Sequence, residues 1–211
     1  MIKKTLRAFT ISMTAIFAFA FAVSSQTVSQ TTSPSTFPNI SIGNFGQMDE
    51  NFYRGAQPQP SDYKSLADLG IKTIIDLRND PTDYEKTSAE AAGIKYVNIP
   101  MSGWQKPDDS DIQKFLDIAN DPATGKFYVH CKAGIHRTGM TGAIYRMTKY
   151  GWDYDQAYQE MKNYHFTSGL VHGGLKSYVK NYAQKLDSKR ALAAKEGGAA
   201  VTTALNGAAI Q

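Results

Sequence analysis

The chain has 211 residues, of which 42% are hydrophobic and 20% are charged, and its net charge is +4. Three positive charges belong to Lys3, Lys4 and Arg7, and without them 20 basic residues stand against 19 acidic ones, so nucleic-acid binding is not indicated. The single cysteine, Cys131, excludes a disulfide within the chain.

The first 25 residues have the pattern of an export signal. A basic start precedes an apolar stretch from Ile11 to Val23, and residues 20–22 (Ala-Phe-Ala) offer small side chains at a cleavage spacing. The stretch is short for a stable membrane span. We therefore expect a signal peptide at residues 1–25, no stable span after cleavage, and a periplasmic or secreted mature protein. An uncleaved amphipathic anchor is the alternative.

Composition divides the remainder of the chain into three parts. Residues 26–45 are rich in Ser, Thr and Gln and predict a flexible leader. Residues 46–187 are long enough for one domain with its own core. Residues 188–211 are rich in Ala and Gly, and we expect a low-complexity tail that is disordered or loosely helical.

Strand and helix patterns alternate through residues 46–187. Buried strands are predicted at residues 71–77, 95–99 and 126–129. Helices are predicted at residues 61–69 (with Ser61 as N-cap), 81–92, 109–118, 138–150, 153–163 and 174–186. This alternation predicts an α/β fold with a mainly parallel central sheet flanked by helices. Ligands of such sheets bind beyond the carboxyl ends of the strands.

The segment His130–Thr138 (HCKAGIHRT) joins a predicted strand to a predicted helix and gives the clearest chemical signal. Cys131 at its start and Arg137 at its end supply a nucleophile and a bidentate clamp for a tetrahedral oxyanion. Gly134 permits backbone angles that turn amide groups inward. A lone cysteine is more often a buried small hydrophobe, but the surrounding loop and Arg137 favour the nucleophile.

This segment resembles the loop of the cysteine-dependent phosphatases, in which His-Cys is followed by five residues and Arg-Ser/Thr. The Cys-Lys-Ala-Gly start is most similar to dual-specificity and lipid or inositol phosphatases. The resemblance implies a dual-specificity-phosphatase-like fold and hydrolysis of phosphate monoesters through a cysteinyl-phosphate. A sulfurtransferase, which also uses a loop cysteine, fits the motif less well.

The resemblance also implies roles for single residues. Cys131 is the nucleophile, and His130 orients the loop from behind without acting as a base. The Thr138 hydroxyl donates to the sulfur and eases its departure in the second step. No metal or cofactor is expected. The implied phosphate-binding residues are Lys132, Ala133, Gly134, Ile135, His136, Arg137 and Thr138.

The general acid has no obvious candidate. Relatives supply it from an aspartate on the loop after the preceding strand, and here that position falls near Gly103. Asp108 is the first candidate and Asp109 the second, while Asp111 is not excluded. The alternative is that these residues favour the start of a helix electrostatically.

Other polar residues surround the predicted site in sequence. The segment Asn51–Pro58 resembles the Tyr-Arg-x-x-Gln-Pro strand of a bacterial and plant-fungal phosphatase group. Its Arg54 either pairs with an acid such as Asp76, which we favour, or lines the pocket. Arg78 is interpreted as an ion-pair partner at a strand end. His165 and His172 lie on a connection that could reach the pocket, but their spacing makes a poor metal site.

Charge inside the loop bears on the substrate. Lys132 and His136 modestly favour a polyanionic substrate, such as an inositol or lipid phosphate, over a phosphoprotein, unless both side chains point to solvent. Two functions follow: a phosphate monoester hydrolase, or a pseudophosphatase that binds phosphorylated ligands without turnover. The unusual Gly103 motivates the second, whereas Cys131 and Arg137 favour the first.

Overall fold

The computed structural model describes residues 37–169 and 172–208. The predicted signal peptide and residues 26–36 of the predicted leader lie outside this part of the chain. The strands are β1 (Gly46–Gln47), β2 (Phe52–Gly55), β3 (Ile71–Arg78), β4 (Lys95–Met101) and β5 (Lys126–His130). The helices are α1 (Asp62–Asp68), α2 (Glu85–Ala91), α3 (Asp109–Asn120), the 3-10 turn η1 (Pro122–Thr124), α4 (His136–Tyr150), α5 (Tyr154–Asn163) and α6 (Gly173–Ala208).

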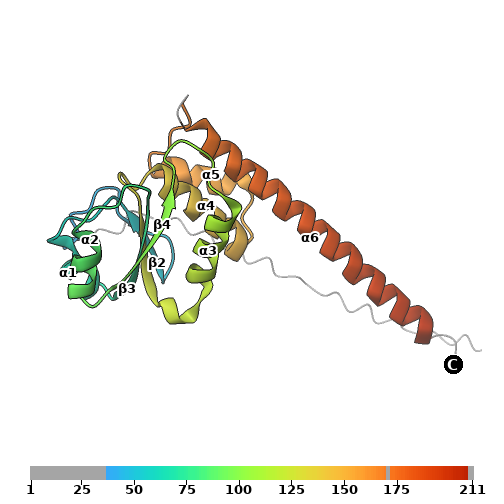
Figure 1. Cartoon of the computed structure of the whole chain (residues 1–211). Coiled ribbons are helices and arrows are strands. Elements are labelled where there is room, and N and C mark those ends of the chain that lie inside the picture. Colours follow the sequence, from blue (N-terminus) through green and yellow to red (C-terminus); the bar gives the residue numbers. More distant parts are fainter. Residues whose placement is uncertain (1–36, 170–171, 209–211) are drawn as a thin grey trace, which may run out of the picture. The chain divides into compact units, whose positions relative to one another are not determined.

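The strands form one sheet in the order β1-β2-β5-β3-β4 (Figure 1). Only the short β1 is antiparallel to its neighbour, and the other three pairs are parallel. The predicted α/β fold with a mainly parallel sheet is therefore confirmed. Because β5 is central, its carboxyl end at His130 lies between the ends of β2 and β3, where parallel sheets bind ligands.

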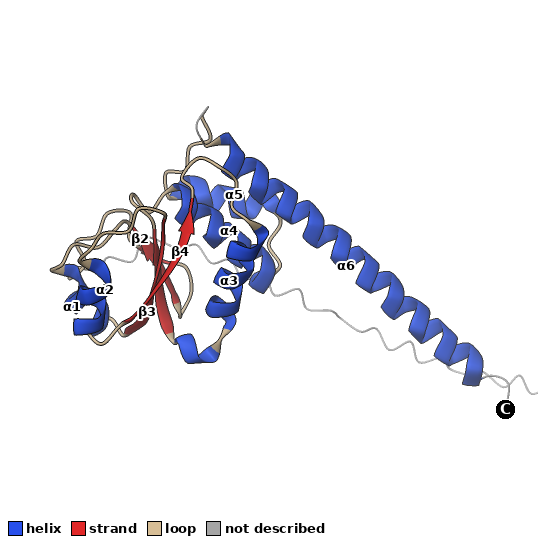
Figure 2. Ribbon diagram, in the orientation of Figure 1, coloured by secondary structure: helices blue, strands red, loops and turns tan. Residues whose placement is uncertain are grey.

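Helices cover both faces of this sheet (Figure 2). Successive side chains of a strand point to opposite faces, and β5 follows this rule. Phe127 and Val129 pack in a core cluster with α3, α4, α5 and α6, whereas Tyr128 between them packs in a second cluster with α1 and α2. Both faces of β5 are thus buried, which explains why its central residues 127–129 are all apolar or aromatic.

The start of α2 differs from the predicted one, and the start of α1 lacks the predicted capping bond. The helix predicted at residues 81–92 begins only at Glu85, because residues 81–84 form a turn in which the Glu85 amide donates to Thr82 O. Ser61 occupies the N-cap position of α1, but its side chain makes no capping hydrogen bond. The first turn is instead tied by Asp62 Oδ2, which accepts from the Gln59 amide at 2.7 Å.

The strand predicted at residues 95–99 continues to Met101 as β4. It passes through Pro100, which lacks an amide donor. β4 is the edge strand of the sheet, and proline is tolerated at edges because one side of the strand has no partner to bond.

The last helix is longer than the predicted span of residues 174–186. α6 continues to Ala208, and an alanine-rich sequence favours the helix because alanine has the highest helix propensity. Leu175, Val179 and Ala183 bury its first turns in the core, whereas side chains 187–195 are exposed.

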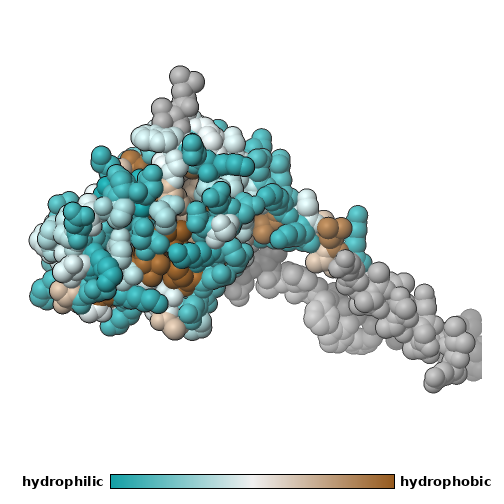
Figure 3. Space-filling model, in the orientation of Figure 1, coloured by the Kyte–Doolittle hydropathy of each residue, from teal (hydrophilic) through white to brown (hydrophobic). Residues whose placement is uncertain are grey.

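Within the described residues, no helix combines the length and apolar character needed to cross a membrane. The face drawn in Figure 3 is largely hydrophilic.

Candidate active site

The predicted nucleophile loop lies between β5 and α4. Cys131 follows the last residue of β5, and Arg137 is the second residue of α4. The helix begins at His136, two residues earlier than predicted, so the loop amides and the helix N-terminus face the same space. Such a terminus favours an anion.

Cys131 is buried, with 4% of its surface exposed. Burial alone would raise the pKa of its thiol, but opposing contributions outweigh it. Hydrogen bonds from the Thr138 hydroxyl and amide, the positive charge of Arg137 and a hydrogen bond from the Gly134 amide lower that pKa overall. The Thr138 hydroxyl is buried and has no nitrogen or oxygen partner in the described part of the chain, which leaves it free for the sulfur. Cys131 is therefore favoured as a thiolate.

The loop carbonyls are held from outside, so that the amides can face inward. Gly134 O accepts from Arg54 Nη2 at 2.6 Å and from Asn44 Nδ2 at 2.9 Å. The Gln57 amide donates to Lys132 O at 3.2 Å. Gly134 has φ +67°, and a Cβ on it would lie 2.2 Å from the Gly55 carbonyl carbon. Only glycine fits there, because the left-handed backbone and the close approach both exclude a side chain.

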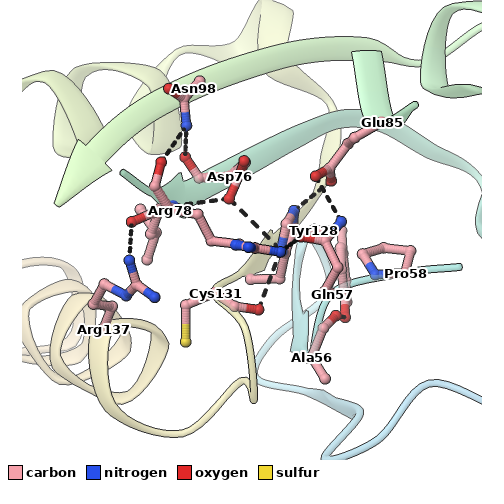
Figure 4. A network of polar contacts seen from close by, with 12 residues as sticks. Ala56, Gln57, Pro58, Asp76, Arg78, Glu85, Asn98, Tyr128, Cys131 and Arg137 are labelled. Atoms are coloured by element: carbon pink, nitrogen blue, oxygen red, sulfur yellow. Dashed lines mark hydrogen bonds and ion pairs between the residues drawn. The ribbon is translucent and has the colours of Figure 1, made fainter. Parts of the chain in front are cut away.

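The guanidinium of Arg137 is held in place through one of its terminal nitrogens, Nη1. Nη1 donates to Leu77 O at 3.2 Å, to Asn79 Oδ1 at 3.2 Å and to Met101 O at 2.9 Å. These acceptors lie at and just after the ends of β3 and β4. Nε and Nη2 make no hydrogen bond within residues 37–169 and 172–208. Figure 4 shows the guanidinium beside the Cys131 sulfur, so these free donors suit a bound oxyanion.

A fully buried polar network lies behind the loop (Figure 4). His130 Nε2 lies 2.6 Å from Glu85 Oε1, and His130 Nδ1 lies 3.8 Å from Asp76 Oδ1. Although burial lowers the pKa of His130, the hydrogen bond and charge of Glu85 and the charge of Asp76 raise it overall. Asp76 Oδ2 also accepts from the Tyr96 hydroxyl at 2.8 Å. His130 thus lies behind the loop. Its side chain contacts the two acids, and its Nδ1 also lies 3.4 Å from the backbone oxygen of Cys131.

Asp76, Glu85 and His130 are also close enough to consider as metal ligands, with ligand atoms within 4.8 Å of one another. Their atoms are already engaged: Glu85 Oε2 accepts from Gln57 Nε2 at 2.6 Å, and Asp76 Oδ1 accepts from the Arg78 amide at 2.8 Å. The remaining atoms, Glu85 Oε1 and His130 Nε2, lie 2.6 Å from each other, which leaves no room for a cation between them and suits a shared proton better.

Glu85 was missed in the sequence, where residues 81–92 were interpreted as a polar helix. A signal was present, because Glu85 and Ala89 are four residues apart and form the buried face of α2. The favoured pairing of Arg54 with Asp76 is wrong, because Arg54 Nη2 binds the loop carbonyl of Gly134 instead. Its structural role is nevertheless observed. Arg78 is an ion-pair partner as predicted, with Nη2 3.0 Å from Asp80 Oδ2.

None of the candidate acids has a hydrogen bond or ion pair to the loop in the described residues. Asp108 is exposed at the N-cap position of α3 without a side-chain capping bond. Asp109 accepts from the Tyr178 hydroxyl at 2.7 Å and from Lys185 Nζ at 3.3 Å, and these contacts lower its pKa. Asp109 is therefore held as a carboxylate, which is unfavourable for an acid. Asp111 lies in the first turn of α3. Asp108 stays a prediction.

Gly103, by contrast, faces the site. A Cβ built on Gly103 would lie 4.0 Å from Arg137 Cζ. Gly103, near which the aspartate of related phosphatases is expected, is therefore next to the arginine and carries no ionisable group.

The loop side chains Lys132 and His136 differ in environment. Lys132 is exposed, in line with the solvent-facing alternative. His136 is half-buried, and its ring stacks on His172 with the ring centroids 3.4 Å apart. His172 thus reaches the loop, as its place on the connection allowed, whereas His165 is exposed.

A profile of the protein family described as "DSP-PTPase phosphatase fused to NAD+ Kinase" matches residues 27–179. The dual specificity protein phosphatase TpbA of Pseudomonas aeruginosa (strain UCBPP-PA14) is 28% identical over 120 residues, which are 56% of this chain and 53% of TpbA. The chain thus spans about half the length of this curated relative.

Solved structures show the same fold. The crystal structure of P. aeruginosa TpbA matches with a TM-score of 0.57 and 25% identity, over 70% of this chain and 88% of that one. The core catalytic domain of the PP-IP phosphatase SIW14 from S. cerevisiae, in complex with citrate, matches with a TM-score of 0.59 and 24% identity, over 70% and 95% of the two chains.

Proposed function

The chain belongs to the cysteine-dependent dual-specificity phosphatase superfamily, and from this premise we propose that it hydrolyses phosphate monoesters through a cysteinyl-phosphate on Cys131. The observation that carries the proposal is a buried thiol whose pKa is lowered by the Thr138 and Gly134 donors and by Arg137. A thiolate is the nucleophilic form of cysteine, and the same donors bind a phosphoryl group.

The reaction has two steps. In the first, the Cys131 thiolate attacks phosphorus in line with the leaving oxygen, so that an S–P bond forms and a P–O bond breaks. Two phosphoryl oxygens bind the free donors of Arg137 as a planar fork, which a lysine cannot copy. In the second, water attacks phosphorus and the S–P bond breaks. The Thr138 hydroxyl stabilises the departing thiolate because it donates to the sulfur.

The decisive variant is Cys131→Ser, assayed with p-nitrophenyl phosphate. We expect hydrolysis to fall by about a thousandfold or more, because the hydroxyl is not ionised in this site. Binding of inorganic phosphate is expected to persist, since the loop amides and Arg137 are unchanged. Vanadate is expected to inhibit the wild type, and chelators to have no effect. Hydrolysis that survives the substitution in a folded variant would refute the mechanism.

The proposed substrate is a phosphorylated protein or an inositol or lipid phosphate. TpbA is described as a protein phosphatase and SIW14 as a PP-IP phosphatase, so phosphatases described for both classes of substrate share this fold. Lys132 is exposed, so its charge does not distinguish between these two substrate classes. Assaying the mature protein against phosphopeptides, inositol phosphates and phosphoinositides, ranked by kcat/KM, identifies the preferred class.

The second candidate function is binding of a phosphorylated ligand without turnover, and Gly103 favours it because the position next to Arg137 carries no acid. A binder has no need of a thiol with a lowered pKa, which counts against it. Turnover of neither aryl nor alkyl phosphates, together with phosphate binding, would support the binder.

We also propose export, on the pattern of residues 1–25 alone. Expression in a bacterium with an export pathway, followed by fractionation and mass measurement of the recovered protein, tests it. A full-length protein in the cytoplasmic fraction would contradict export.

A further inference from the structure

Departure of an alkoxide or phenoxide from phosphorus is accelerated when a general acid gives the leaving oxygen a proton. The sequence comparison with related phosphatases places their aspartate near Gly103, and Gly103 lies next to Arg137. Asp109 is held as a carboxylate by Tyr178 and Lys185. A proton for the leaving oxygen must therefore come from another side chain near Gly103.

His172 fills the space beside Gly103. Its Nδ1 lies 2.9 Å from Gly103 O. A carbonyl oxygen can only accept a hydrogen bond, so Nδ1 carries a hydrogen and donates. The second nitrogen, Nε2, makes no hydrogen bond within the described part of the chain. An imidazole oriented through one nitrogen and free at the other has the arrangement that a catalytic histidine needs.

His136 links His172 to the loop from the other side. The two rings stack with their centroids 3.4 Å apart and their planes at 20°. Burial, the positive charge of His172 and that of Arg137 lower the pKa of His136 to about 4. His136 is therefore neutral at neutral pH, which leaves His172 as the member of the pair that the geometry places to donate a proton.

We propose that His172 is the general acid of this site and takes the place of the missing aspartate at Gly103. The inference rests on the proposed phosphatase function. As the S–P bond forms and the P–O bond breaks, the proton on Nε2 passes to the leaving oxygen. In the second step, the neutral imidazole takes a proton from the attacking water, which restores the starting state.

The charged and titratable groups on the elements around His172 are His136 and Arg137 on α4, Lys106 and Asp108 on the loop of Gly103, and Lys176 on α6. Lys176 is directed to the ring of Tyr158, 4.7 Å from its centroid. The neighbours that act on the histidine pair are thus chiefly cationic.

The test is the substitution His172→Asn, because the asparagine amide can still donate to Gly103 O but has no proton to transfer. Values of kcat/KM are measured on p-nitrophenyl phosphate, whose leaving group needs little protonation, and on phenyl phosphate, whose leaving group needs more. We expect a small loss on the first ester and a loss of about 100-fold on the second. The alkaline decline of the wild-type rate on phenyl phosphate is expected to disappear.

His165→Asn is the matched control. His165 lies on the same connection, is exposed and has φ +64°, a backbone conformation that asparagine tolerates. It is expected to leave both rates unchanged. Equal losses on the two esters in His172→Asn would reduce His172 to a positioning residue and overturn the proposal, as would no loss on either. A selective loss on phenyl phosphate in Asp108→Asn instead would assign the acid to Asp108.

These outcomes are separable from a failure of the proposed function. If Cys131→Ser abolishes hydrolysis of p-nitrophenyl phosphate and His172→Asn shows no selectivity between esters, the phosphatase function is supported and the role of His172 as general acid is refuted. If Cys131→Ser is fully active, the cysteinyl-phosphate mechanism itself is wrong.

Discussion

Cys131 owes its lowered pKa mainly to groups of its own loop and helix, and a residue of a distant strand supports that loop. Thr138 and Gly134 belong to its own loop and helix, and the HCx5RT motif alone predicted their role. Arg54 acts from β2, where it is fully buried and holds the Gly134 carbonyl outward. The sequence did not predict this contact, because a side chain that binds a backbone carbonyl leaves no complementary residue to recognise. An acid was sought as the partner of Arg54, and a carbonyl fills that role.

Arg54→Met is expected to raise the pKa of the Cys131 thiol. The substitution removes a buried positive charge near the thiolate and leaves the Gly134 carbonyl held by Asn44 alone, which weakens the positioning of the loop amides. The pH dependence of alkylation by iodoacetamide measures the change. At neutral pH, kcat/KM for p-nitrophenyl phosphate is expected to fall about tenfold or more.

Arg146→Met is the matched control for this experiment. Arg146 is also a buried arginine, but it pairs with Glu160 at 2.7 Å and donates to Met48 O, away from the loop. Its loss is expected to reduce stability without moving the thiol titration. The same thiol pKa in both variants and the wild type would show that Arg54 does not act on Cys131.

The sequence predicts a helix or strand correctly where the hydrophobic pattern within the segment itself determines its structure. β5 and α4 were expected from apolar runs and helical spacing, and the loop between them from its glycine and polar residues. α2 is shorter than predicted because Pro81 and its neighbours form a turn, and its buried face includes an acid. The segment is polar on average, so the sequence does not show that one face of the helix is buried. A glutamate is expected on the surface unless a buried partner, here His130, is known.

The connection between α5 and α6 also has a feature that the local sequence does not predict. Its histidines were noticed as a possible approach to the pocket, but nothing local distinguishes His172, which stacks on His136, from His165, which is exposed. The distinction depends on where α6 begins relative to the loop of Gly103. That placement results from packing of Leu175 and Val179 in the core, which brings distant segments together.

In the whole molecule, the buried network behind the loop couples stability to pH. The pKa of His130 is raised in the folded state by Glu85 and Asp76, although burial opposes this. A raised folded pKa means that the stabilisation is fully present below the unfolded value of about 6.5 and is lost as pH rises through the folded value. Cys131 acts in the opposite direction, because its lowered pKa adds stability as pH rises toward the ordinary thiol value.

Glu85→Gln, made in a Cys131→Ser background to remove the thiol titration, isolates the contribution of His130. The free energy of unfolding of the background protein is expected to fall above about pH 6.5, by up to about 1.4 kcal/mol per pH unit from this histidine. Glutamine keeps the shape but not the charge that holds the proton on His130, so the decline is expected to be shallower in Glu85→Gln. Urea unfolding from pH 5 to pH 9 measures both slopes.

Glu90→Gln in the same background is the matched control, because Glu90 is on the same helix and makes only an exposed ion pair with Lys86. Its curve is expected to follow that of the background protein. If the Glu85→Gln and Glu90→Gln curves run parallel across the range, His130 does not carry a proton held by Glu85. The network behind the loop would then be a set of neutral hydrogen bonds, and the orientation of the nucleophile loop would not depend on its charge.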